Sequence, residues 1–145
     1  MKLHAYLNFE GKTEEAFKFY ETALGGKLTD IVRFKDMPME GVEIPKGDQG
    51  KVMHVGLRLG NDEMIMGTDV LESLGQKLVV GNNAHISVHP ESKEAADRIF
   101  NALSEGGSVE QPMADAPWGD YFGMFQDKYG VRWMVNYSPS EGTSD

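Results

Sequence analysis

The chain contains no cysteine among its 145 residues. A protein without thiols forms no disulfide, has no cysteine nucleophile and holds no metal through thiolates. The sequence also lacks an apolar run long enough to cross a bilayer, and its first residues lack the apolar core of a signal peptide. These absences predict a cytoplasmic protein that has no membrane partner.

Basic residues are scarce. The chain has 14 Lys and Arg against 23 Asp and Glu, which gives a formal net charge of −9 at pH 7. Nucleic-acid binding needs clustered positive charge, so this balance argues against a nucleic-acid partner. The hydrophobic content of 40% is ordinary for a globular protein. A chain of this length fits one domain, or two small halves that share a core.

The stretch 117–137 carries both tryptophans. It predicts an aromatic strand over 121–126, a tight turn over 127–130 and a second strand over 131–137. In the second strand Val131, Trp133 and Val135 alternate with three more polar positions. Because successive strand residues point to opposite faces, the apolar set belongs in a core and the other set lines a cavity or faces solvent.

Both halves of the chain have the same order of elements. Gly25 follows His4 by 21 residues, and Gly106 follows His85 by the same interval. The first half predicts strand 3–9, helix 13–24 with Thr13 as its N-cap, strand 28–34, polar loop 35–50, strand 51–59 and strand 63–68. The second half predicts strand 84–88, a helix capped by Ser92, strand 108–111, loop 112–118 and the hairpin. The buried stripe of that helix is predicted to be Ala96, Ile99, Phe100 and Leu103.

We therefore predict an α+β fold built from two tandem βαβββ modules, at about residues 1–69 and 82–137, within one domain of residues 1–145. Each module places its helix outside a curved mixed sheet, whose other face forms a concave cup. We assign to the cup the less apolar residues of each strand: His4, Tyr6, Asn8, His54, Arg58, Met64, Met66, His85, Ser87, Arg132, Met134 and Asn136.

Three of the four histidines and two arginines fall in this set. Such a composition favours a lined pocket with a few convergent polar groups. The alternative is a solvent-exposed sheet face on which the histidines are incidental. The loop over 35–50 is long enough to cover a site.

Two segments point to a known family. They are Ala5–Gly11 with Glu15–Tyr20, and Trp118-Gly119-Asp120 with the following hairpin through Trp133-Met134. With the tandem modules, they make the chain resemble the vicinal oxygen chelate superfamily of glyoxalases, bleomycin-resistance proteins and dioxygenases, and its PhnB-like group in particular. That group has been labelled as methyltransferases. The chain has no glycine-rich strand-to-helix loop followed by an acidic residue, so we disfavour this activity.

The resemblance implies a divalent-metal site in the cup, with ligands from the first and last strands of the modules. The positions that match are His4 and His85 in the first strands, and Met64 and Met134 in the last strands. A thioether is a poor replacement for the hard oxygen donor that these metals need. The resemblance therefore leaves His4 and His85 as candidate metal ligands in an incomplete site.

Two functions of the cup remain open, beside a third possibility in which the fold serves mainly for assembly and the pocket is vestigial. In the first, the cup binds a small aromatic or anionic molecule without metal. Flat apolar area would come from Trp118, Tyr121 and Phe122, an adaptable lining from Met64 and Met134, charge from Arg58 and Arg132, and polar contacts from Tyr6, Asn8 and His54. In the second, a divalent metal on His4 and His85 supports glyoxalase-like or dioxygenase-like chemistry. The resemblance also implies a homodimer whose cup lies near or across the interface.

Overall fold

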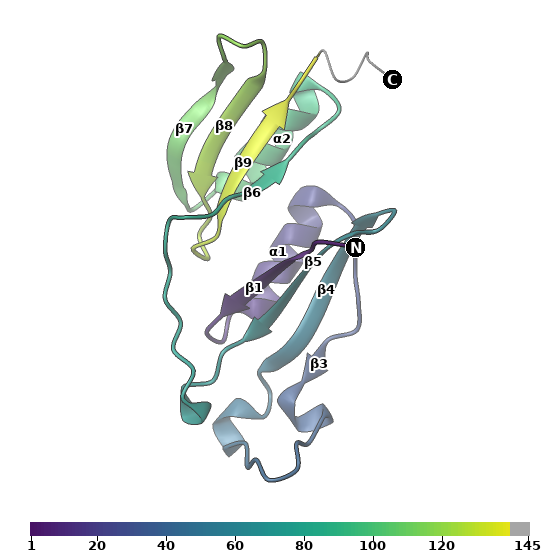
Figure 1. The fold of residues 1–145 in the computed structure, drawn as a ribbon, viewed down its shortest axis with the longest axis vertical. Helices are drawn as coiled ribbons and strands as arrows, with labels where there is room; N and C mark the ends of the chain where they lie inside the picture. Colours follow the sequence, from purple (N-terminus) through teal and green to yellow (C-terminus); the bar gives the residue numbers. More distant parts are fainter. Residues whose placement is uncertain (140–145) are drawn as a thin grey trace. The chain divides into compact units, whose positions relative to one another are not determined.

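In the computed structural model, which describes residues 1–139, the chain forms two compact units, Met1–Val79 and Val80–Asp145 (Figure 1). Each unit has one long helix packed on its own sheet. Within the described residues, no helix combines the length and the apolar character that a membrane span requires. The α+β class is confirmed, and both units run strand, helix and then further strands, with one more short strand in unit 1.

Unit 1 contains β1 (Ala5–Phe9), α1 (Thr13–Leu24), β2 (Lys27–Leu28), β3 (Val32–Arg33), β4 (Val52–Gly60) and β5 (Glu63–Asp69). Its sheet has the order β1-β5-β4-β2, and β3 also pairs with β4. The strand predicted over 28–34 is interrupted. The N–H of Gly56 donates to the Thr29 hydroxyl at 2.9 Å, so a side chain takes the place of a backbone ladder bond there.

Unit 2 contains β6 (Ile86–Val88), α2 (Lys93–Ser104), β7 (Ser108–Asp115), β8 (Tyr121–Gln126) and β9 (Arg132–Tyr137). The sheet order β6-β9-β8-β7 repeats that of unit 1. In both sheets the first strand runs parallel to the last, as β1 does to β5 and β6 to β9. In each unit the helix connects the first strand to the strand at the opposite edge of the same sheet.

Each helix buries one face against its sheet, and α2 buries the stripe that its sequence predicts. In α2 the buried residues are Ala96, Ile99, Phe100 and Leu103, and the Phe100 ring meets the Phe125 ring edge-on at 5.0 Å between centroids. In α1, Phe17 is fully buried against β5. A Cβ on Gly67 of β5 would lie 2.5 Å from the Phe17 ring, so only glycine lets the helix pack this closely.

The prediction of Thr13 as a helix N-cap is wrong, whereas that of Ser92 is confirmed by the 3.1 Å bond from the Ala95 N–H to its hydroxyl. Thr13 is already inside α1 and is fully buried. Its N–H and hydroxyl donate to Oδ1 of Asp69 at 3.1 and 2.7 Å. A carboxylate from the end of β5 thus serves the N-terminus of α1, where negative charge is favoured.

Two boundary predictions are also wrong. Leu3 is 89% exposed and lies outside β1, so it is not a core residue. The loop predicted from residue 112 is strand β7, which continues to Asp115. Pro112 lies within β7, which is an edge strand. An edge strand tolerates proline at a position that faces away from the sheet, because no backbone N–H is needed there.

The polar loop after β3 folds into short 3₁₀ turns, Phe34–Asp36 and Lys46–Asp48. These turns and the chain between them surround a hollow of about 300 Å³, which is lined by Phe34, Met39, Ile44 and neighbouring residues. None of the cup residues predicted from the sequence lines it.

Candidate functional site

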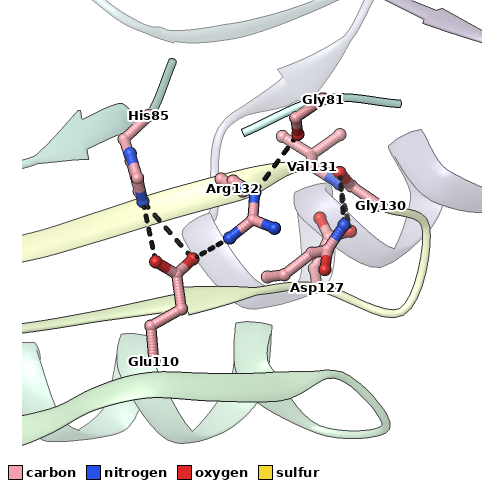
Figure 2. A network of polar contacts seen from close by, with 8 residues as sticks. Gly81, His85, Glu110, Asp127, Gly130, Val131 and Arg132 are labelled. Atoms are coloured by element: carbon pink, nitrogen blue, oxygen red, sulfur yellow. Dashed lines mark hydrogen bonds and ion pairs between the residues drawn. The ribbon is translucent and has the colours of Figure 1, made fainter. Parts of the chain in front are cut away.

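The helix-free face of the unit 2 sheet carries a three-residue polar network (Figure 2). Nε2 of His85 lies 3.3 Å from both carboxylate oxygens of Glu110. Nη1 of Arg132 donates to Oε1 of Glu110 at 2.6 Å, and Nε of Arg132 donates to the Gly81 carbonyl at 3.2 Å. The structure therefore joins two of the predicted cup residues, His85 and Arg132, through a carboxylate.

Glu110 was not among the predicted site residues. The register between β7 and β8 shifts between Val109 and Gln111, so Glu110 is an extra residue in β7 with no partner of its own on β8. A bulge of this kind re-aims a side chain. The strand predicted over 108–111 has only one apolar residue, so no alternation in the sequence indicated which way Glu110 would point.

The contact between His85 and Glu110 also shows that the sheet of unit 2 is curved. His85 directly precedes β6 and Glu110 lies on β7, and these strands form opposite edges of the four-stranded sheet. Three strand spacings amount to about 14 Å across a flat sheet, which exceeds the combined reach of the two side chains and the gap between them. The sheet is therefore curved, and its helix-free face is concave.

An aromatic pair lies at the other end of the same face. Phe122 is on β8, and the Trp118 ring in the preceding loop packs against it at 5.4 Å between centroids, with 35° between the planes. Trp118 is 68% exposed. The loop is tied to β9 because Nδ2 of Asn136 donates to Oδ2 of Asp120 at 3.2 Å.

Between the aromatic pair and the polar network lies a row of thioethers. Met124 on β8 is directly opposite Met134 on β9, which in turn lies beside Ser87 on β6. The Ser87 hydroxyl is 2.9 Å from Nε2 of His89. The concave face thus changes from aromatic, through thioether and hydroxyl, to charged along the strands.

Tyr121 does not share this face. Its hydroxyl donates to Oδ1 of Asp97 on α2 at 2.6 Å, and the Lys93 ammonium lies 4.6 Å from its ring centroid. The structure therefore places Tyr121 on the helix side of β8. The hydrogen bond to Asp97, with burial and the nearby carboxylates, raises the pKa of Tyr121 to about 12.

The raised pKa of Tyr121 gives a test of this placement. Because the fold favours the neutral phenol, the bond to Asp97 stabilises the protein below pH 10 or so and is lost as the pH rises towards 12. We expect Tyr121→Phe to lower the free energy of unfolding by about 1 kcal/mol at neutral pH, since the bond is partly exposed to solvent. In a phenolate absorbance titration this variant should lose one component that titrates near pH 12.

The matched control is Tyr137→Phe, which changes the residue directly opposite Tyr121 on β9. It should leave the component that titrates near pH 12 in place. If both variants titrate alike, the bond from Tyr121 to Asp97 does not form in solution.

Unit 1 has its own helix-free face, which carries several predicted residues. The Tyr6 hydroxyl lies 3.2 Å from Nδ1 of His54, and Tyr6 is directly opposite Met66 on β5. Met64 is opposite Arg58 on β4, and its methyl group lies over Gly56, where a Cβ would approach it to 3.1 Å. Asn8 pairs with Thr68 and is exposed.

The candidate metal ligands lie in different units. His4 precedes β1 and is exposed, whereas His85 is held by Glu110. Among residues 1–139, no three His, Asp or Glu side chains come together in a way that would hold a metal ion. Beside His85 the hard oxygen donors of Glu110 already accept from the Arg132 guanidinium, which is permanently positive. The donor set of unit 2 therefore does not fit a divalent cation.

Comparisons with known proteins agree with this architecture. Residues 2–135 match the family model described as Glyoxalase/Bleomycin resistance protein/Dioxygenase superfamily. The protein YjdN of Escherichia coli is 27% identical over 150 residues, covering 99% of each chain. The crystal structure of PA1353 from Pseudomonas aeruginosa is 37% identical, with a TM-score of 0.84 over 95% of this chain and 98% of that one.

A PhnB protein from Bacillus cereus, for which a 3-demethylubiquinone-9 3-methyltransferase activity has been suggested, is 28% identical. Its TM-score is 0.75 over 95% of this chain and all of that one. A glyoxalase/bleomycin resistance protein/dioxygenase family enzyme from Burkholderia phytofirmans, 16% identical with a TM-score of 0.62, shares the fold. The chain belongs to the glyoxalase/bleomycin resistance protein/dioxygenase superfamily, also called the vicinal oxygen chelate superfamily, and has PhnB-like neighbours within it.

Proposed function

We propose that the concave face of unit 2 binds a small molecule with a planar apolar part and does so without a divalent metal. The observation that carries this proposal is the Trp118–Phe122 pair. A tryptophan that is 68% exposed and packed on a second ring offers a flat apolar surface, which favours stacking of a planar group.

The thioether row supports the same ligand class. Met124 and Met134 are adjacent to the aromatic pair, and methionine adapts its shape to irregular apolar ligands. The face thus continues the apolar surface toward the centre of the sheet. A ligand stacked on Trp118 would extend over these side chains.

The polar end of the face favours a neutral hydrogen-bond acceptor over an anion. The charge of Arg132 is offset by Glu110, with which it is in direct contact. Nη2 of Arg132 donates to no other residue that the structure describes, so it is available to a carbonyl or amide oxygen of the ligand. The anionic ligand considered from the sequence is a weaker match to this arrangement.

The metal-dependent alternative uses His4 and His85 for glyoxalase-like or dioxygenase-like chemistry. Its support is the presence of a histidine beside a carboxylate on the concave face. We place it second because Arg132 occupies the carboxylate. The methyltransferase description belongs to the Bacillus cereus protein. In this chain the strand-to-helix turn after β1 is Glu10-Gly11-Lys12, which is not a glycine-rich loop for a cofactor.

Calorimetric titration with matched probes tests the proposal. We expect 2-naphthamide, a planar neutral amide, to bind more tightly than cyclohexanecarboxamide, its smaller non-planar counterpart, and more tightly than the anion 2-naphthoate. Replacing Trp118 or Phe122 with alanine should weaken 2-naphthamide binding by about tenfold, since a ring contact contributes roughly 1–1.5 kcal/mol beyond its area.

The control is Leu74→Ala, which removes a large, exposed apolar side chain from unit 1. It should leave the affinity unchanged. Equal affinity for the planar and the non-planar probe, or full retention of binding in the Trp118 variant, would refute the proposed site.

A further inference from the structure

We infer that the guanidinium of Arg132 is a built-in cation that keeps the His85–Glu110 pair closed to divalent metal ions. The pair lies on the concave face of unit 2. The inference rests on the metal-free part of the proposed function. The planar-ligand titration tests the other part, so the two failures can be told apart.

Without Arg132, the two other side chains would make a plausible pair of ligands. Imidazole nitrogen and carboxylate oxygen are ordinary ligands of Zn²⁺, and imidazole also suits Ni²⁺. His85 comes from the start of β6 and Glu110 from the bulge of β7, and their contacting atoms are 3.3 Å apart. The curvature of the sheet has therefore already brought the two side chains together.

The hydrogen-bond directions oppose a metal at this pair. A carboxylate only accepts, so in the contact with Glu110 the proton must come from Nε2 of His85. That nitrogen then has no lone pair to offer an ion between the two residues. Metal binding there would require His85 to change tautomer and give up its bond.

Arg132 is the stronger obstacle. Its Nη1–Oε1 distance to Glu110 is 2.6 Å, which is typical of a strong charge-assisted bond. The guanidinium cannot be deprotonated in proteins, so a divalent ion on Glu110 would lie beside a permanent positive charge and be repelled by it.

The backbone holds Arg132 in this position. Nε donates to the Gly81 carbonyl at 3.2 Å, and only 21% of the side chain is exposed. The turn before β9 is fixed by Asp127, which accepts from the Val131 N–H at 3.0 Å. The arginine is therefore anchored on both sides and does not move aside freely for an ion.

The test is a calorimetric titration of Zn²⁺ and Ni²⁺ into the full chain at neutral pH. We expect no stoichiometric site involving His85 in the wild type. Arg132→Met removes the charge but keeps much of the bulk, and should tighten metal binding by about tenfold or more. Arg132→Lys keeps the charge and should behave like the wild type.

Two further variants assign the gain to this pair. His85→Ala introduced into the Arg132→Met protein should abolish the gain. Arg58→Met is the matched control, because it removes an exposed arginine from the sheet of unit 1. It should leave the metal affinity at the wild-type value.

Three results would overturn the inference. The first is a stoichiometric metal site in the wild type that His85→Ala destroys. The second is an Arg132→Met protein that folds normally by circular dichroism yet gains no metal affinity, and the third is an equal gain in metal affinity in Arg58→Met. If Arg132→Met does not fold, Arg132→Gln removes the same charge and answers the same question. The first result needs only the wild-type and His85→Ala titrations, so it does not depend on any arginine variant.

Discussion

Replacing Asp127 with alanine is expected to lower the free energy of unfolding by about 3 kcal/mol, because it leaves buried hydrogen-bond donors without an acceptor. Asp127 is 3% exposed. Its Oδ1 accepts from the backbone N–H groups of Tyr129 and Val131 at 2.8 and 3.0 Å, and its Oδ2 accepts from Nε1 of Trp133 at 2.8 Å. Urea unfolding followed by the fluorescence of the buried Trp133 measures the loss.

The matched control is Asp115→Ala. Asp115 is in the same unit, its side chain is 76% exposed, and it pairs with Lys93 at the surface. It should change stability by about 0.5 kcal/mol or less. Asp127→Asn should fall between the two, because an amide cannot accept at both of its heavy atoms. A cost for Asp127→Ala no larger than that of Asp115→Ala would contradict the contacts described.

The same substitution should affect the candidate site. Asp127 closes the turn that leads directly into β9, and Arg132 is the first residue of that strand. A loosened turn frees the guanidinium from its fixed position. In the metal titration, Asp127→Ala should therefore shift toward the behaviour of Arg132→Met.

Asp69→Ala is expected to have a similarly large effect in unit 1, about 3 kcal/mol of unfolding free energy. Asp69 is 3% exposed and joins three elements. Oδ1 accepts from the N–H and hydroxyl of Thr13 in α1, and Oδ2 accepts from the N–H of Val52 at the start of β4 at 2.9 Å. Both tryptophans lie in unit 2, so far-ultraviolet circular dichroism is the better probe.

A graded series separates the contributions at this carboxylate. Thr13→Val removes only the hydroxyl donor and should cost about 1 kcal/mol. Asp62→Ala, at a position whose side chain is 79% exposed and paired with Lys2, should cost about 0.5 kcal/mol or less. If Asp69→Ala is as mild as Asp62→Ala, the carboxylate does not hold the three elements together in solution.

The sequence predicts the fold well where hydrophobic periodicity is strong. The alternation of Val131, Trp133 and Val135 gave the facing of β9, and the structure buries Trp133 and Val135 almost completely. The buried stripe of α2 was likewise predicted residue by residue. In these elements a single buried face determines both the position and the orientation of the side chains.

Predictions that depend on partners far along the chain were less successful. Thr13 looked like an N-cap because its hydroxyl precedes a helical pattern, but the carboxylate that serves the helix lies 56 residues away. Tyr121 was assigned to the cup for its aromatic character. The structure places it on the other face because it alternates with Phe122 and bonds to Asp97. The partner of Thr13 is not visible in the local pattern, whereas the facing of Tyr121 follows from strand alternation with Phe122.

The candidate site was predicted in part. His85 and Arg132 were both assigned to the concave face, but the sequence did not indicate that they share one carboxylate. That link needs the register of β7, and the bulge at Glu110 depends on how β7 pairs with β8. A strand with one apolar residue does not specify its register from sequence. The position of Trp118 over Phe122 depends in the same way on a loop tied down by Asn136.

The irregularity of β7 also bears on how the protein avoids aggregation. This strand is one edge of its sheet, and its register with β8 shifts twice, once at Glu110 and again between Gln111 and Ala114. Pro112 lies within the second shift and has no N–H to offer a neighbouring chain. Bulges and proline are devices that prevent a foreign strand from adding to an exposed edge. The β7 edge is thus poorly suited to intermolecular strand pairing, and a homodimer formed through sheet edges would need a different strand.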